Sequence, residues 1–92
     1  MLTLDQIRKR MESLADWALE GDSIVRDFIF QDSKVATEFI MRVNELAEKI
    51  DHHPLILMDQ NHLRLSLTTH SAGGLTEKDF ELAEEIDKLP LS

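Results

Sequence analysis

The sequence contains no cysteine, only three glycines and two prolines, and no long apolar run. Without cysteine, the chain can form neither a disulfide bond nor a thiolate metal site. Met1 leads directly into a charged segment, a pattern that argues against a signal peptide, and the lack of a long apolar run argues against a membrane span. We therefore predict a cytoplasmic protein with no membrane partner.

Basic side chains are also scarce, since 10 Lys and Arg residues stand against 18 Asp and Glu residues and give a formal charge of −8. This charge opposes binding to a phosphate backbone, and no local basic patch offsets it, so we expect no direct nucleic-acid partner. The chain is long enough for a single domain, residues 1–92. Its core would be modest, which makes association into oligomers a natural way to bury more apolar surface.

Apolar residues recur with the two periods of regular secondary structure. Spacings of three and four, as in Val35, Phe39 and Val43, predict helices, and alternation along 23–30 predicts a strand. Asp32 is placed to cap one helix, and Thr76 with Asp79 to cap another. The pattern predicts helices over 3–14, 31–51 and 77–89, and strands around 17–19 and over 23–30, 55–59 and 62–69.

The last two strands form a hairpin if Gln60 and Asn61 make a tight turn. With this register, apolar residues face one another on one side of the hairpin. Two hairpins beside three helices predict an α+β fold, a two-layer arrangement of a four-stranded antiparallel sheet with helices on one face, in the order helix-β-β-helix-β-β-helix. The facing pairs are Met58 with Leu63, Ile56 with Leu65, and Pro54 with Leu67.

Three of the four histidines should gather at the open end of this hairpin. Facing residues lie roughly 5 Å apart at Cβ, so the register brings His52, His53 and His70 close together. His62 lies at the opposite, turn end, and we interpret it as a surface residue. Extended to the open end, the register pairs His52 with Thr69, and His70 with Asp51.

A group of three imidazoles suits either metal binding or proton transfer near neutral pH. Adjacent strand residues point to opposite faces, so His52 and His53 would not easily share one metal. Glu48 and Asp51 are placed to hydrogen-bond an imidazole and set its tautomer. Polar residues that merely end a strand are the plain alternative, but three histidines at one position favour a functional site.

The combined spacing of these residues resembles the pterin-4a-carbinolamine dehydratases, also called 4a-hydroxytetrahydrobiopterin dehydratases. The similarity extends to Trp17 and to the segments RDFIF and EKIDHHP, so it covers most of the chain. The residues that carry the resemblance are Glu48, His52-His53-Pro54, His70, Gly73-Gly74-Leu75-Thr76 and Asp79.

The resemblance implies a lyase that removes water from a 4a-hydroxytetrahydropterin in tetrahydropterin recycling, works without a metal or organic cofactor, and forms a homodimer or homotetramer. By the same resemblance, His52, His53 and His70 would be the acid–base catalytic residues. Asp79 also fits the family pattern, and we interpret it as a cap of the last helix. The residues expected to contact the substrate are Glu48, Pro54, Thr69, Ser71 and Ala72.

Two positions depart from the family pattern, because Gln60 stands where an aromatic residue is usual and Leu55 where an acidic one often follows the proline. An aromatic side chain could stack on a pterin, which Gln60 cannot do. The alternative function is a noncatalytic dehydratase-like binding module, either a transcriptional coactivator or a carboxysome and Rubisco assembly factor. Gln60 and an exposed pair, Leu55 and Leu57, favour that alternative. A small metal-binding protein is a third, weaker hypothesis.

Overall fold

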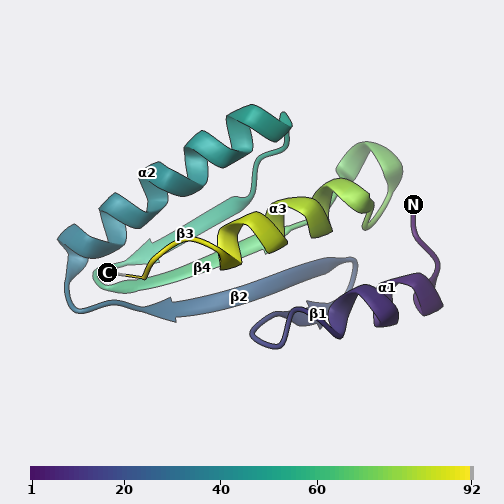
Figure 1. The fold of residues 1–92 in the computed structure, drawn as a ribbon, viewed down its shortest axis with the longest axis horizontal. Helices are drawn as coiled ribbons and strands as arrows, with labels where there is room; N and C mark the ends of the chain where they lie inside the picture. The colour runs from purple at the N-terminus through teal and green to yellow at the C-terminus, as the bar shows by residue number, and fades with distance from the viewer. Residues whose placement is uncertain (92) are drawn as a thin grey trace.

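A computed structural model describes residues 1–91, and the one-domain prediction extends one residue further, to Ser92, which lies outside the described residues. Figure 1 shows two long helices lying along a twisted sheet, with the short first helix at the far edge. Within residues 1–91, no helix combines the length and apolar character needed to cross a membrane. The elements are α1 (Leu4–Met11), β1 (Ala18–Glu20), β2 (Ser23–Ile29), α2 (Ser33–Ile50), β3 (Leu55–Asp59), β4 (His62–Leu67), a 3₁₀ turn (His70–Ala72) and α3 (Glu77–Asp87).

The four strands form one antiparallel sheet in the order β1-β2-β4-β3. The predicted hairpin register is confirmed, because Met58 pairs with Leu63 and Ile56 with Leu65. The tight turn at Gln60 is confirmed as well, and Gln60 adopts a left-handed backbone conformation with φ of 56°. Helices α2 and α3 cover the same side of the sheet (Figure 1), so the predicted α+β fold is the observed one.

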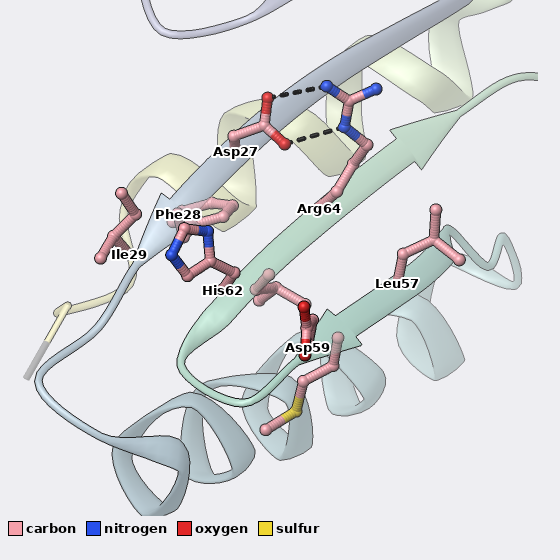
Figure 2. Close-up of a pocket in the computed structure, with 9 residues that line it drawn as sticks. Asp27, Phe28, Ile29, Leu57, Asp59, His62 and Arg64 are labelled. Atoms are coloured by element: carbon pink, nitrogen blue, oxygen red, sulfur yellow. Dashed lines mark hydrogen bonds and ion pairs between the residues drawn. The ribbon is translucent and has the colours of Figure 1, made fainter.

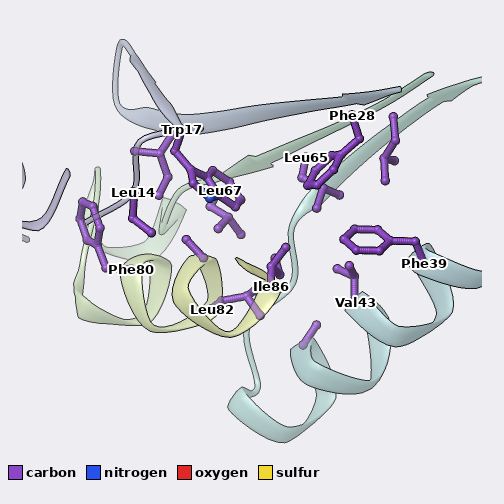
Figure 3. Close-up of a cluster of buried hydrophobic side chains, with 14 of the residues drawn as sticks. Leu14, Trp17, Phe28, Phe39, Val43, Leu65, Leu67, Phe80, Leu82 and Ile86 are labelled. Atoms are coloured by element: carbon purple, nitrogen blue, oxygen red, sulfur yellow. The ribbon is translucent and has the colours of Figure 1, made fainter. Parts of the chain in front are cut away.

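The core lies between the sheet and these two helices (Figure 3). Phe39 of α2 packs against Phe28 of β2 and against Phe30, directly after β2, with ring centroids 4.9 and 5.1 Å away. Trp17 is buried, and its Nε1–H donates to Oδ1 of Asp87 at the end of α3, 2.8 Å away. The apolar side chains predicted to face the core from α2 and from β2 therefore pack against one another.

Helices α1 and α3 both end earlier than their apolar patterns predict. Helix α1 stops at Met11 instead of residue 14, because the chain then makes tight turns in which Leu14 N–H donates to Met11 O and Trp17 N–H to Leu14 O. These turns bury Leu14 and Trp17 in the core, which a continued helix would not do. Helix α3 likewise ends at Asp87 instead of residue 89.

Helix α2 spans Ser33–Ile50 within the predicted 31–51, and its N-cap is the predicted Asp32. The carboxylate of Asp32 accepts the Val35 N–H at 2.9 Å, which is the expected N-cap. At the other end, Asp51 adopts a left-handed conformation with φ of 57°, and its N–H and that of His52 bond back to the last turn. This left-handed residue turns the chain out of the helix directly before His52 and His53.

Candidate active site

His52 and Asp79 form a pair at the junction of α2 and α3. Nε2 of His52 lies 2.5 Å from Oδ1 of Asp79. An ionised carboxylate can only accept, so Nε2 carries the hydrogen and Nδ1 is the nitrogen left for other partners. The Asp79 side chain is fully buried and that of His52 is 12% exposed. A buried carboxylate is stable only when it is paired and hydrogen-bonded, and this pairing fixes the imidazole in one orientation.

The second oxygen of Asp79 is held by two further donors. Oδ2 accepts the Thr69 hydroxyl at 2.8 Å and the Thr76 backbone N–H at 2.9 Å. The bond to Thr76 is the helix cap that the sequence predicts, and the bonds to His52 and Thr69 are additional. Asp79 thus helps to cap the first turn of α3 and orients a histidine at the same time. Sequence reasoning recognised only the cap.

His70 begins the 3₁₀ turn that follows β4, and this arrangement corrects the predicted end of the hairpin. The paired strands stop at Leu55 and Ser66, and Thr69 forms a bridge with Gly74 instead of facing His52. The predicted pairs of His52 with Thr69 and of His70 with Asp51 are therefore wrong. The physical reason is that His52 N–H is bonded to Ala47 O in the cap of α2, so its backbone is not part of the sheet.

The histidine segments nevertheless meet, through side chains instead of strand pairing. Asp79 contacts both His52 and Thr69, and Thr69 directly precedes His70. The remaining predicted contact residues surround this junction. Pro54 is partly buried after the two histidines, and Ser71 and Ala72 are exposed in the 3₁₀ turn.

His53 is the most exposed member of the His52–His53 pair, with 53% of its side chain accessible. Its Nε2 lies 3.6 Å from Oε1 of Glu48, which is one helical turn earlier. The expectation that Glu48 approaches an imidazole is met at His53, while Asp51 serves as the exposed cap of α2. Exposed pairs of this kind are weak, so His53 remains free to reorient toward a ligand.

The side chains described here do not form a metal centre. Within residues 1–91, no three histidine or acidic side chains converge closely enough to hold a metal ion. The metal-binding hypothesis therefore rests on the sequence pattern alone. An imidazole oriented by a carboxylate, as His52 is by Asp79, is a suitable group for moving protons.

A separate open concavity of about 550 Å³ lies at the turn end of the sheet, on the face away from α2 and α3 (Figure 2). It contains His62, which is exposed as predicted. Figure 2 shows Asp27 and Arg64 pointing toward one another, joined by two hydrogen bonds of 2.8 and 3.0 Å. The hydrogen bond from Arg64 lowers the pKa of Asp27 below its usual value. The concavity is lined by Asp27, Phe28, Ile29, Leu57, Met58, Asp59, His62, Leu63 and Arg64.

Gln60 also lies at this turn end. The whole of β3 separates it from His53 and Pro54, and at about 3.3 Å per residue its five residues span roughly 13 Å. Gln60 and the histidines therefore lie at opposite ends of β3.

The protein is thus a two-layer α+β domain with a buried histidine–carboxylate pair at the junction of α2 and α3. A model of the family described as pterin 4 alpha carbinolamine dehydratase matches residues 1–89. The chain belongs to this family. A relative from Sulfurisphaera tokodaii, named "Putative pterin-4-alpha-carbinolamine dehydratase", is 40% identical over 96% of this chain and 95% of its own length. A relative of the same name from Acidobacterium capsulatum is 46% identical over 96% of each chain.

Two solved structures resemble this fold, one over nearly all of the chain and one over about three quarters of it. A transcriptional coactivator/pterin dehydratase from Brucella melitensis superposes with a TM-score of 0.88 and 33% identity, covering 94% of each chain. A pterin dehydratase-like protein described as a RuBisCO assembly factor in the alpha-carboxysome has a TM-score of 0.62 and 18% identity, covering 77% of this chain and 82% of its own. The second likeness shows a shared fold only.

Proposed function

We propose that this protein catalyses the dehydration of a 4a-hydroxytetrahydropterin to the quinonoid dihydropterin and water, in cytoplasmic tetrahydropterin recycling. The observation that carries the proposal is the buried Asp79, which holds His52 in one orientation beside the segment that bears His70. Membership of the dehydratase family supports the same reaction.

The reaction breaks one bond, C4a–O, and requires two proton transfers. A proton is delivered to the 4a-hydroxyl oxygen, the C4a–O bond breaks and water leaves, and the proton on N5 is removed. The substrate thus loses one water, and no oxidant, reductant or cofactor takes part. An imidazolium donates the first proton and a neutral imidazole accepts the second, both of which histidine can do near neutral pH.

We assign His52 and His70 to the two sides of the departing hydroxyl, with His53 as the assisting proton-transfer group. Asp79 acts through His52 and is a positioning residue. Its bond to Nε2 directs Nδ1 toward the substrate. The backbone at Pro54 and over residues 69–72, together with the Glu48 side chain, would hold the pterin ring.

The direct test generates the 4a-hydroxytetrahydropterin with an aromatic amino acid hydroxylase and follows its loss in the presence of the purified protein. We expect dehydration faster than the spontaneous rate at micromolar protein, in proportion to protein concentration. The rate without added protein is the baseline. Loss of the intermediate at the spontaneous rate would exclude the dehydratase function.

We further propose that the protein is a homodimer or homotetramer. Leu55 and Leu57 support this, because they are 59% and 53% exposed on β3, which is an edge strand of the sheet. Exposed apolar residues on a sheet edge favour association. Sedimentation equilibrium should give two or four times the chain mass of 10.6 kDa. A mass of one chain at micromolar concentration would contradict the proposal.

The same exposed residues favour a second candidate function, a noncatalytic binding module. The Brucella melitensis structure carries the description of a transcriptional coactivator as well as a pterin dehydratase. For this function, Leu57→Lys should abolish partner binding, while His52→Ala should leave partner binding unchanged. Affinity capture with each variant separates the two functions.

A further inference from the structure

The side chain of Thr69 connects the two histidine-bearing segments. Its hydroxyl donates to Oδ2 of Asp79 at 2.8 Å, and Oδ1 of the same carboxylate bonds to His52. The Thr69 hydroxyl has a single hydrogen, which Asp79 uses. The 2.9 Å contact between the hydroxyls of Thr69 and Thr76 must therefore be donated by Thr76. The bonds run in one direction, from Thr76 to Thr69 to Asp79, and such chains polarise one another favourably.

The backbone of Thr69 fixes the turn that carries His70. Its carbonyl accepts the N–H groups of Ala72 at 3.0 Å and Gly74 at 3.3 Å, and its own N–H donates to Gly74 O at 3.2 Å. Gly73 closes the turn with φ of 76°, a conformation that favours glycine. One residue thus anchors the His70 turn through its main chain and the His52–Asp79 pair through its side chain.

We infer that Thr69 is a positioning residue whose hydroxyl sets the geometry of His52 relative to the His70 turn. The catalytic part of this inference rests on the proposed dehydratase function, and the structural part does not. Without the hydroxyl, Oδ2 of Asp79 keeps only the Thr76 N–H, and the carboxylate can rotate about its side-chain torsions. His52 would then lose its fixed orientation although all three histidines remain present.

Two substitutions separate the hydroxyl from the shape of the side chain. Thr69→Val preserves the branched shape and removes the donor, whereas Thr69→Ser preserves the donor. Thr68→Val is the matched control, because the neighbouring Thr68 hydroxyl donates to Asp22 O at 2.7 Å and makes no contact with Asp79. Removing a supporting hydrogen bond behind a catalytic group typically lowers activity by about 10- to 100-fold. We expect that loss in kcat for Thr69→Val, KM within about twofold, and near wild-type kcat for Thr69→Ser and Thr68→Val.

The ring resonances of His52 provide a readout that does not depend on turnover. In spectra of protein labelled with ¹⁵N-histidine, Thr69→Val should shift or broaden the Nε2 signal of His52 and leave that of His62 unchanged. Thr69→Ser and Thr68→Val should reproduce the wild-type spectrum. If Thr69→Val does not fold, Thr69→Ala removes the same hydroxyl with less steric demand and enters the same comparison.

The outcomes distinguish failure of this inference from failure of the proposed function. An unchanged His52 signal in the variant without the hydroxyl would overturn the positioning role, whatever the activity. A wild-type protein that does not accelerate dehydration would exclude the proposed function, and the spectra would still decide the role of Thr69. Equal losses of kcat in Thr69→Val and Thr69→Ser would also overturn the positioning role of the Thr69 hydroxyl, because the hydroxyl would then not be the relevant group.

Discussion

Nε2 of His52 lies 2.5 Å from Oδ1 of Asp79, although 27 residues separate the two in sequence. One follows α2 and the other lies in the first turn of α3. Their contact fixes how these two helices meet at one end of the domain. The carboxylate also determines which nitrogen of His52 faces outward, so the helix packing and the chemistry of the site depend on the same bond.

Asp79→Asn should separate capping from orientation. The amide retains an oxygen for the Thr76 N–H but presents a neutral group to His52. We expect turnover to fall by about 10- to 100-fold. Asp32→Asn is the control, because it makes the same change at the N-cap of α2, away from any histidine contact. Steady-state kinetics of both variants would test this, and equal activity of the two would contradict the orienting role.

The effect of a histidine substitution on kcat should depend on where the histidine lies. His52→Ala and His70→Ala should each lower kcat by about 100-fold or more, since general acid–base groups contribute about 10²- to 10⁴-fold. His62→Ala should leave kcat unchanged, because His62 lies at the turn end of the hairpin. Circular dichroism would establish that each variant is folded. Wild-type rates in His52→Ala or His70→Ala would refute the assignment.

Substitutions at Gln60 should change the free energy of unfolding more than they change kcat. A residue other than glycine in the left-handed region lowers the free energy of unfolding by about 1–2 kcal/mol through steric strain. Glycine avoids this strain but lowers the free energy of unfolding by about 0.4–1 kcal/mol, because the unfolded chain gains conformational entropy. Gln60→Gly should therefore raise the free energy of unfolding by about 0.5–1 kcal/mol. Gln60→Val should lower it, because a β-branched residue tolerates a φ of 56° poorly. Urea denaturation would measure both, and a less stable Gln60→Gly would contradict the strain at this turn.

The Asp27–Arg64 pair should contribute to stability only above acidic pH. Arg64 lowers the pKa of Asp27 in the folded state, so this contribution is present above the unfolded value of about 3.8 and is lost as the pH falls through the lower folded value. Since the Asp27 side chain is 60% exposed, its size should be at most about 1 kcal/mol. The difference in unfolding free energy between wild type and Asp27→Asn should shrink between pH 7 and pH 2. A difference that grows toward low pH would contradict this.

The fold could be read from the sequence because its signals are local. The apolar stripe on α2, the alternation along β2 and the turn at Gln60 each depend on neighbouring residues, and each predicted element is present. Helix ends were less certain, as at Met11, where burying Leu14 outweighed continuing the helix. Tertiary packing decides such boundaries, and spacing alone does not encode it.

The site could be predicted in composition but not in geometry. The hairpin predicted that the segments bearing His52 and His70 lie at one end, yet the contacts that join these segments run through Asp79 and depend on how α3 packs. No local pattern indicates that Asp79 contacts a residue 27 positions earlier. The extrapolated strand pairing at Thr69 was wrong for the same reason, since a 3₁₀ turn and a bridge to Gly74 replaced it.

Helix α3 is held at both ends by side chains from distant parts of the chain. Its first turn is joined to His52 through Asp79, and its last turn to Trp17 through Asp87. A molecule in which α3 has detached would still contain every histidine, but none would be oriented by the carboxylate. Local opening of this one helix therefore also breaks the His52–Asp79 pair, and the lifetime of the docked helix sets an upper limit on how long that pair stays assembled.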